Sequence, residues 1–419
     1  MAKSDFSKNV LTLMSGTTIA QIISFAISPI LSRIYSPEAF GAFGFLTSII
    51  GVLVLFVGGR YEAAILIPKR DKDAINLFVF SVFLNLIISI FYFIGILVIF
   101  HCFDLTSKIT NSSLSFFYLI PLLTFFLGCT QSINNWFNRK KMYKAIVIYR
   151  VTNSLVNSIG STSIGTFGIK TNGLILSYFG TSILTIFIFY KRIKADVISN
   201  YSNISKQRML YLAKKYKHFP LTNSFQALSD SFQINGIIYF ISYFFELFYV
   251  GIFSFALRIL MVPMNLVGGA LSQVFYQQAT EVYNTGGDIY SLTKKTIFKS
   301  LLLVIPVFFI LLFFGPFLFE FIFGEQWRIA GEYARILSPW ILLDFIKAPV
   351  SQIPIIIGKQ NRMLFLSMVS NIIVLVTMLY AGVVVQNIEI GFYLLSIFQS
   401  LYIVFIILWV LKISKKIKL

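Results

Sequence analysis

The chain has 419 residues, of which 57% are hydrophobic and only 12% are charged, and its formal net charge is +19. Soluble domains carry roughly 25% charged residues, so this composition excludes an ordinary soluble domain and instead fits about twelve membrane spans of roughly 20 residues. A strongly basic soluble protein would favour nucleic acid as a partner. Here the basic residues flank apolar stretches, so we expect no nucleic-acid binding.

The apolar stretches predict an all-α polytopic membrane protein with about twelve transmembrane helices. In chain order the expected spans are 10–32, 41–66, 74–100, 114–135, 146–168, 173–191, 219–243, 249–276, 296–322, 334–357, 363–385 and 390–411. The first span has no convincing cleavage site before Pro29, so we interpret it as a retained helix and not as a signal peptide. Four spans are nearly uniformly apolar and are expected to face lipid: 74–100, 296–322, 363–385 and 390–411.

Lysine and arginine are distributed unequally between the two sides of the membrane. With the N-terminus inside, the cytoplasmic segments hold 28 basic residues, whereas the outside loops hold the five residues Arg33, Lys108, Lys170, Arg328 and Arg335. Positive residues accumulate in cytoplasmic loops, so both termini are predicted to lie in the cytoplasm. The short outside loops leave no room for an external catalytic domain.

The second half of the chain repeats part of the first half. At a shift of 210 residues, nine of 28 positions in 32–59 are identical to positions in 242–269. The alternative is a coincidence of the biased composition. A duplicated unit of six helices keeps its orientation in the membrane, as in parallel-repeat transporters whose site lies between two lobes. We therefore expect six-helix lobes at 1–195 and 218–419, joined by a basic cytoplasmic linker at 196–217.

Four charged residues stand out near the centres of predicted spans, where each charge costs about 2.5–3.5 kcal/mol on insertion scales. They are Asp230, Arg258, Asp344 and Lys347, and the last two are three positions apart on one helix face. One interpretation is two ion pairs, Asp230 with Arg258 and Asp344 with Lys347, that hold helices in register. The other is a polar cavity that binds a charged ligand group and couples to protons or Na⁺.

Three further charged residues lie at the ends of spans. Arg60 and Glu62 follow Gly58-Gly59 near the inner end of span 41–66. Residues two positions apart on a helix point to different faces, so we expect these two side chains to diverge. Arg60, like Arg33 at the outer end of the first span, either serves a cavity or reaches out to lipid phosphates.

Polar amides gather in span 219–243. Gln226, Asp230 and Gln233 share one helical stripe, and Asn235 follows closely. Hydrogen bonds between helices explain isolated amides in membranes, whereas a whole stripe favours a wall that binds sugar hydroxyls.

Motifs of catalysis and of metal binding do not appear in the sequence. The two histidines, His101 and His218, have no partners at the spacing of metal ligands, so we expect no metal site. Neither a P-loop nor a nucleophile elbow occurs. We therefore expect a transporter without a cofactor, and not an enzyme.

Several strings carry a family resemblance. They are Ile-x-Pro-x-Leu-Ser-Arg-x-Tyr-Ser-Pro-Glu-x-Phe-Gly from Ile27 to Gly41, Gly-Arg-Tyr-Glu at 59–62, Asn-Trp-Phe-Asn-Arg-Lys-Lys at 135–141, Arg258 with Pro263, Ser-Gln-Val-Phe-Tyr at 272–276, and Gly-Lys-Gln at 358–360. Together they resemble bacterial polysaccharide flippases of the Wzx type. Those proteins belong to a superfamily of exporters that also includes multidrug antiporters and the lipid II flippase.

The resemblance implies two six-helix lobes around a V-shaped cavity in the bacterial inner membrane. It also implies an alternating-access mechanism that moves an oligosaccharide on undecaprenyl pyrophosphate from the cytoplasmic to the outer leaflet. The moved units would serve the synthesis of O-antigen or another surface polysaccharide, and the implied partners are a polysaccharide polymerase and a chain-length regulator. In the lipid II relative, arginines on helices 1, 2 and 8 line the cavity. Arg60 and Arg258 match two of these, while helix 1 offers only Arg33 at its end.

We accordingly assign roles to ten residues. The substrate-binding residues are Arg258, Lys347, Arg60, Arg33, Gln226, Gln233 and Asn235, and the ion-coupling residues are Asp230, Asp344 and Glu62. The alternatives are a cation-coupled multidrug antiporter, which needs an acidic and aromatic cavity, and a membrane polysaccharide polymerase or ligase, which needs a sizeable outside loop.

Overall fold

The computed structural model describes residues 2–102, 114–220 and 224–415, and helices are the regular elements of these ranges. Nine helical stretches among them are long and apolar enough to cross a membrane, as expected of a multi-pass membrane protein. Lys108 of the predicted outside loops lies outside the described residues, and so do the last four residues of the basic tail.

The chain divides into two compact units, which we describe one at a time. Unit 1 comprises Met1–Ser24 and Ala42–Ser231. Its helices are α1 (Ala2–Ala26), most of α3 (Pro37–Val57), α4 (Tyr61–Ala64), α5 (Asp71–Cys102), α6 (Leu114–Phe117), α7 (Ile120–Arg139), α8 (Tyr143–Thr166), α9 (Gly173–Ser199), η2 (Tyr201–Asn203), α10 (Lys206–Lys215) and the start of α11 (Ser224–Phe244).

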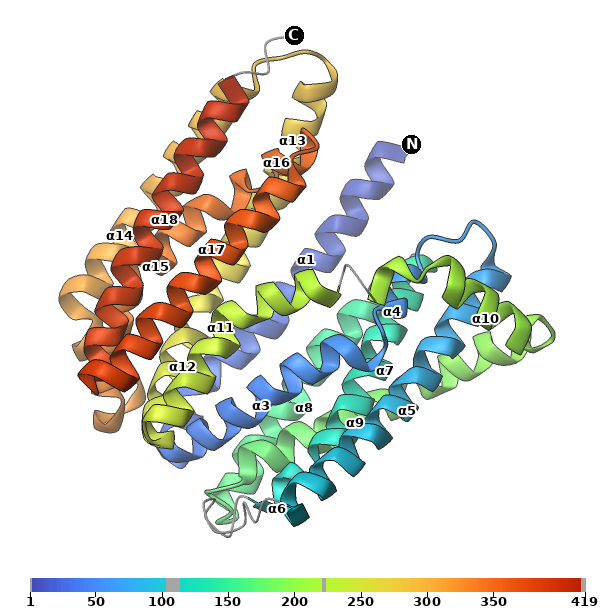
Figure 1. The fold of residues 1–419 in the computed structure, drawn as a ribbon, viewed down its shortest axis with the longest axis horizontal. Coiled ribbons are helices and arrows are strands. Elements are labelled where there is room, and N and C mark those ends of the chain that lie inside the picture. The colour runs from blue at the N-terminus through green and yellow to red at the C-terminus, as the bar shows by residue number, and fades with distance from the viewer. Residues whose placement is uncertain (1, 103–113, 221–223, 416–419) are drawn as a thin grey trace. The chain divides into compact units, whose positions relative to one another are not determined.

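In unit 1, α5, α7, α8 and α9 pack side by side (Figure 1). They enclose a core that includes Phe78, Trp136 and Phe137. The segment expected as a linker is mostly helical, because α9 runs to Ser199 and α10 packs on α5. Asn76 of α5 fixes the turn before α10, since it donates to the carbonyl of Asn203 and accepts from the Ser205 amide.

Unit 2 comprises Phe25–Gly41 and Phe232–Leu419. Its helices are α2 (Ser28–Ile34), the start of α3, the rest of α11, α12 (Leu247–Pro263), the π-helical η4 (Met264–Gly268), α13 (Gly269–Asn284), α14 (Ile289–Phe323), η5 (Glu325–Trp327), α15 (Arg328–Val350), α16 (Ile353–Ile356), α17 (Gln360–Leu379), the π-helical η6 (Tyr380–Val385) and α18 (Ile388–Lys415).

The most buried helix of unit 2 is α15, which packs against α12, α14 and α18. The core beside its first turn is aromatic. Trp327 is fully buried and lies 4.0 Å from Phe255, measured between ring centroids. Its indole nitrogen donates to the carbonyl of Ser32 over 2.9 Å, so α2 is tied to this core although it is far away in sequence.

Helices of the structure overlap all twelve predicted spans, although nine meet the length and hydropathy criteria for a membrane span. The three helices that do not meet them are α7, α8 and α11. Each carries several buried or half-buried amides and hydroxyls, so its mean hydropathy falls below that of a lipid-exposed helix although its length suffices.

One detail of the predicted spans is wrong. The span 41–66 is not one helix, because α3 ends at Val57 and the chain turns through Gly58–Arg60 before α4 begins. The lipid-facing prediction holds best for α5 and α14, whose apolar windows are only 11% and 17% buried, whereas the window of α18 is 39% buried. Even α5 buries one polar stripe, consisting of Ser81, Asn85 and Ser89.

Candidate functional site

The turn between α3 and α4 brings two predicted site residues together. Gly59 and Arg60 adopt the left-handed backbone conformation, with φ of 55° and 59°. For a residue with a side chain this conformation costs on the order of 1–3 kcal/mol and is typical of functional sites. The prediction that Arg60 and Glu62 diverge is wrong, because no helix runs through the turn. Nη1 of Arg60 lies 3.9 Å from Oε1 of Glu62.

Glu62 is buried inside unit 1, and its side chain is only 5% exposed. Among the described residues its Oε2 atom has no hydrogen-bond donor, and Oδ1 of Asn85 likewise has none. Asn85 donates through Nδ2 to the sulfur of Cys129 over 3.8 Å. Asn85 is not among the site residues predicted from the sequence, although Ser81, Asn85 and Ser89 recur at helical spacing along α5.

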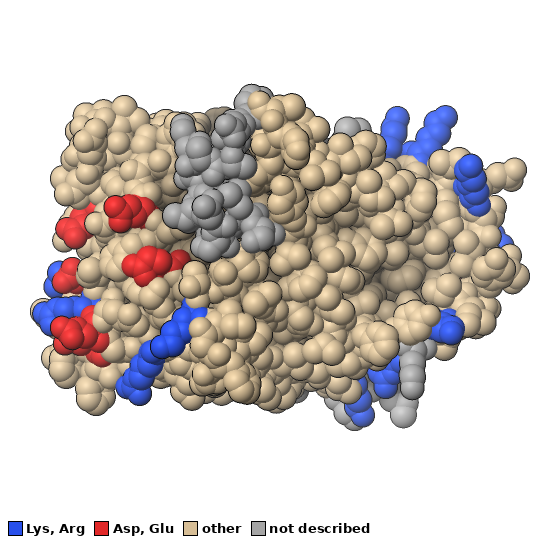
Figure 2. Space-filling model, turned by 90° about the horizontal axis from the view of Figure 1, so that it is seen from below, with Lys and Arg blue, Asp and Glu red and all other residues tan. Residues whose placement is uncertain are grey.

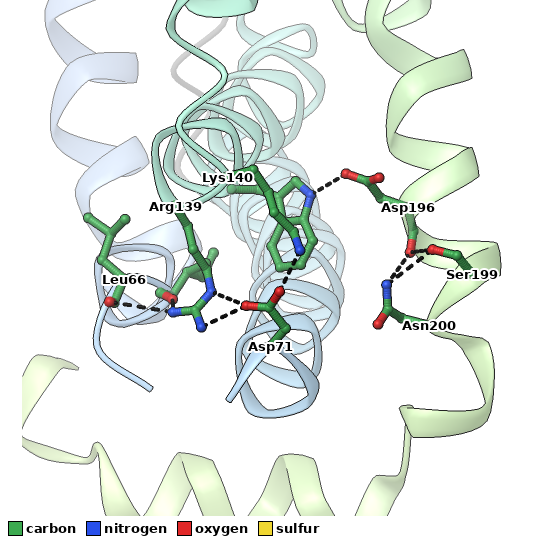
Figure 3. A network of polar contacts seen from close by, with 9 residues as sticks. Leu66, Asp71, Arg139, Lys140, Asp196, Ser199 and Asn200 are labelled. Atoms are coloured by element: carbon green, nitrogen blue, oxygen red, sulfur yellow. Dashed lines mark hydrogen bonds and ion pairs between the residues drawn. The ribbon is translucent and has the colours of Figure 1, made fainter. Parts of the chain in front are cut away.

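A second polar network joins the start of α5 to the end of α7 in unit 1 (Figure 3). Asp71, the first residue of α5, accepts from Arg139 over 2.9 Å and from Lys140 over 2.6 Å, both at the end of α7. Arg139 also donates to the carbonyl of Ile65. An acid in a first turn and a base in a last turn both suit the helix dipole. We interpret this network as a structural clamp.

Trp136 extends this clamp to α9. Its indole nitrogen donates to Oδ2 of Asp196 over 2.8 Å, and Asn200 donates in turn to the carbonyl of Asp196 (Figure 3). Asp196 lies in the segment that was expected as a linker. The end of α9 therefore belongs to the hydrogen-bonded core of unit 1.

Arg258 occupies the middle of α12 in unit 2. It is the twelfth residue of that helix, about 16 Å from its start at roughly 1.5 Å per residue. Its neighbours Leu257 and Leu260 are buried, and Arg258 itself is half-buried. Among the described residues of unit 2, no acidic side chain pairs with it and no hydrogen-bond acceptor meets it. The guanidinium therefore keeps its charge and its donors for another partner.

Lys347 and Asp344 of α15 form an ion pair one helical turn apart. The side chains are 17% and 33% exposed, respectively. This geometry corresponds to the paired interpretation of these two charges, and it leaves the pair neutral as a whole. Unlike Arg258, Lys347 must give up a partner before it can bind an anion.

The predicted amide stripe of α11 does not form one uniform surface. Gln226 and Asp230 are exposed, whereas Gln233 and Asn235 are half-buried. Gln233 donates to Oγ of Ser370 in α17 over 3.0 Å. Ser370 in turn donates to the side-chain oxygen of Gln399 in α18. Gln233 thus serves helix packing in unit 2.

The remaining predicted residue, Arg33, is exposed at the end of α2.

On the face that Figure 2 shows, most of the surface carries no charge. The Asp and Glu side chains visible there lie at the left of that view together with Lys and Arg, whereas the charged side chains visible at its right are Lys and Arg. Within the described residues, no group of three His, Cys, Asp or Glu could hold a metal ion.

The sequence pattern of the family described as "Polysaccharide biosynthesis protein" matches residues 30–331. A search of curated proteins returned no match. The family match agrees with the resemblance that the sequence strings carry.

Solved structures share the fold over nearly the whole chain. An inward-facing multidrug resistance MATE family transporter of the MOP superfamily is 16% identical, with a TM-score of 0.72, and the alignment covers 97% of this chain and 95% of that one. An outward-facing structure of such a transporter is 14% identical, with a TM-score of 0.65 and coverage of 98% and 96%. A MOP superfamily transporter from Pyrococcus furiosus is 15% identical, with a TM-score of 0.64 and coverage of 98% and 96%.

Proposed function

Because the chain belongs to the polysaccharide biosynthesis protein family, we propose that it is a flippase for undecaprenyl-pyrophosphate-linked oligosaccharide repeat units. It would move them from the cytoplasmic to the outer leaflet of the bacterial inner membrane, for O-antigen or another surface polysaccharide. The MATE-like fold supports a transporter and not an enzyme. A polymerase and a chain-length regulator that use the delivered units would be its partners.

The proposal includes the architecture that such a cycle needs. Twelve helices cross the membrane, in six-helix lobes at 1–195 and 218–419 that are related as parallel repeats and joined by the basic segment 196–217. Both termini lie in the cytoplasm. Alternating access then arises from rocking of one repeat against the other around a site near mid-membrane.

The observation that carries the proposal is the guanidinium of Arg258, which lies in the middle of an apolar helix and has no ion-pair partner among the described residues of unit 2. A charge at this depth is costly to insert, and a helix-packing role would give it a partner in its own unit. A pyrophosphate is a dense anion, and arginine binds phosphate oxygens through two parallel N–H donors. In surroundings of low dielectric constant this attraction is far stronger than in water.

Other residues supply secondary contacts in this proposal. Arg60 and Arg33 offer further guanidinium groups, and Lys347 joins them when its pair with Asp344 opens. Gln226 and Asn235 hold sugar hydroxyls. Gln233 does so only if it leaves Ser370. The coupling ion, a proton or Na⁺, binds at Asp230, Asp344 or Glu62, and no cofactor is required.

The rival transport function is export of organic cations. Such an antiporter needs an acidic cavity, whereas Asp344 is neutralised by Lys347 and Arg258 is unpaired in its unit. The Pyrococcus furiosus relative is described as having a binding pocket of reverse polarity that suggests a different function. Charge therefore separates functions within this fold. A polymerase or ligase would need a large outside loop with catalytic residues, and the sequence offers none.

Complementation in cells tests the proposal. A bacterial strain that lacks its own flippase, and that makes the matching repeat unit, should regain surface polysaccharide with the natural chain and lose it with Arg258→Ala. Arg258→Lys should restore part of it, since the charge remains. Arg192→Ala, which removes an exposed arginine of α9, is the matched control and should restore it fully. Full surface polysaccharide with a normally inserted Arg258→Ala chain would refute the role of Arg258.

A further inference from the structure

We propose that Glu62 and Asn85 form a proton-binding site inside unit 1, in which the protonated carboxyl of Glu62 donates a hydrogen bond to the amide oxygen of Asn85. This inference rests on the proposed function only for its use in transport. It selects one of the three ion-coupling residues, names its partner, and names the ion.

Two glycines define the geometry of the site. A side-chain carbon on Gly58 would lie 2.5 Å from Oε2 of Glu62 and 3.1 Å from Oδ1 of Asn85. A side-chain carbon on Gly128 of α7 would lie 2.8 Å from the same oxygen of Asn85. Both oxygens therefore face the same small space beside Gly58, which only the missing side chains leave open. Nδ2 of Asn85 is turned away from this space, toward Cys129.

The contacts of the two oxygens favour a neutral carboxyl. Both atoms are buried acceptors without a donor among the described residues, and burying an unpaired polar atom is destabilising, more so when the atom is charged. A protonated carboxyl has one O–H donor. Its hydrogen bond to Asn85 satisfies both oxygens at once, whereas an ionised carboxylate would place two acceptors against each other.

The charged and titratable groups around Glu62 are few. The cation is Arg60, whose guanidinium lies 3.9 Å from Oε1 and so beyond hydrogen-bond distance. From α7 the titratable group is the buried thiol of Cys129, and α5 contributes the neutral Asn85. Tyr61 turns its hydroxyl to the carbonyl of Ala213 and takes no part. One distant cation is weak compensation for a buried carboxylate.

The available ligands also favour a proton over a metal cation. Hard cations such as Ca²⁺ or Mg²⁺ require six or more oxygen ligands. The described residues around this space offer the oxygens of Glu62 and Asn85, while the neighbouring Cys129 sulfur is a soft ligand that suits other metals. A single proton needs only one donor–acceptor pair, and that pair is present.

The repeat restricts the site to one half of the chain. The shift of 210 residues maps Gly58-Gly59 onto Gly268-Gly269 but maps Glu62 onto Ser272. In unit 2 the space beside Gly268 is filled by the ring of Phe345. The glycines are thus common to both halves, whereas the acid belongs to the first half alone.

Infrared spectroscopy of the full chain in lipid nanodiscs, without substrate, tests the site. A protonated buried carboxyl gives a C=O stretching band, whereas ordinary glutamates, with a pKa of about 4.3, are ionised at pH 7. We expect such a band at pH 7, absent from Glu62→Gln and unchanged in Glu389→Gln, which removes an exposed acid of α18. In Asn85→Leu the band should move to higher frequency, because its hydrogen bond is lost. In Arg60→Gln it should persist to higher pH, because the nearby positive charge is gone.

Two results would overturn the proposal. One is the absence of a Glu62-dependent band at pH 7, which would mean that Glu62 is ionised and that the Asn85 amide is turned to donate to it. The other is a band that disappears when K⁺ is replaced by Na⁺ at constant pH, which would make this a sodium site. The spectrum needs no substrate, so a failure of the proposed flippase activity would leave the band intact, and loss of the band would leave that activity untouched.

Discussion

Gly41 and Gly251 lie against each other where α3 crosses α12, and they are equivalent positions of the repeat. A side-chain carbon on Gly41 would overlap the carbonyl oxygen of Leu247, and one on Gly251 would overlap the carbonyl oxygen of Pro37. The shift of 210 residues that maps Gly41 onto Gly251 also maps Pro37 onto Leu247. The contact is therefore reciprocal, as in an isologous interface, and it supports the proposed duplication.

Adding a methyl group at this crossing should destabilise the protein. Gly41→Ala and Gly251→Ala each force the methyl group against backbone atoms, which cannot turn aside, and overpacking of this kind costs about 1–3 kcal/mol. Gly95→Ala in α5 is the matched control, because nothing lies within 4 Å of the added carbon. Thermal unfolding in detergent should give a lower Tm for both crossing variants and an unchanged or higher Tm for Gly95→Ala. Equal values would contradict the close packing.

The clamp between the start of α5 and the end of α7 should depend more on Arg139 than on Asp71. Asp71 is 53% exposed, so Asp71→Asn should lower the free energy of unfolding by less than about 1 kcal/mol, and less at high salt. Arg139 is 10% exposed and also binds the carbonyl of Ile65. Arg139→Ala leaves that carbonyl without its donor, which should cost about 1–3 kcal/mol. Equal effects in denaturation at two salt concentrations would argue against the clamp.

The pair Asp344–Lys347 should behave as a unit in a double-mutant cycle. Lys347→Gln alone leaves a half-buried carboxylate unpaired, and Asp344→Asn alone leaves an unpaired ammonium group. The double variant should unfold at a higher temperature than the less stable single variant, with a coupling of roughly 0.5–3 kcal/mol. Additive effects of the two substitutions would show that the ion pair contributes nothing to stability.

Two glutamines of α11 should separate packing from substrate binding. Gln233→Leu removes the donor to Ser370 and should lower stability. Gln226 is exposed, so Gln226→Leu should leave stability unchanged and reduce surface polysaccharide in the complementation assay. Measuring Tm and polysaccharide on the same two variants distinguishes the roles. A stable and fully active Gln226→Leu chain would remove Gln226 from the site.

The sequence predicts where the helices lie because long apolar stretches are a strong and local signal. The sequence does not predict side-chain directions that depend on an unusual backbone conformation. The Gly58-Gly59 pair was visible, but only the left-handed Arg60 brings its guanidinium toward Glu62 instead of away from it. Arg258 was recognisable as a misplaced charge, whereas its lack of a partner within unit 2 depends on tertiary packing.

The buried partner Asn85 was hidden for a different reason. Span 74–100 is so apolar that its average indicates lipid on all sides, and averaging conceals the stripe of Ser81, Asn85 and Ser89 that faces the protein. The polar residues of α11 led to the opposite error. Their common stripe predicted one surface that binds sugar hydroxyls, but Gln233 donates a hydrogen bond to Ser370 of α17. Polar side chains between membrane helices often serve helix packing in this way.

The central claim is that Arg258 binds the pyrophosphate head of the substrate during its movement between leaflets. The most direct measurement uses proteoliposomes that contain a fluorescent undecaprenyl-pyrophosphate oligosaccharide, with leaflet exchange followed by a membrane-impermeant quencher. We predict fast exchange with the natural chain and with Arg192→Ala, partial exchange with Arg258→Lys, and none above protein-free vesicles with Arg258→Ala. Exchange by Arg258→Ala at the natural rate would contradict the account.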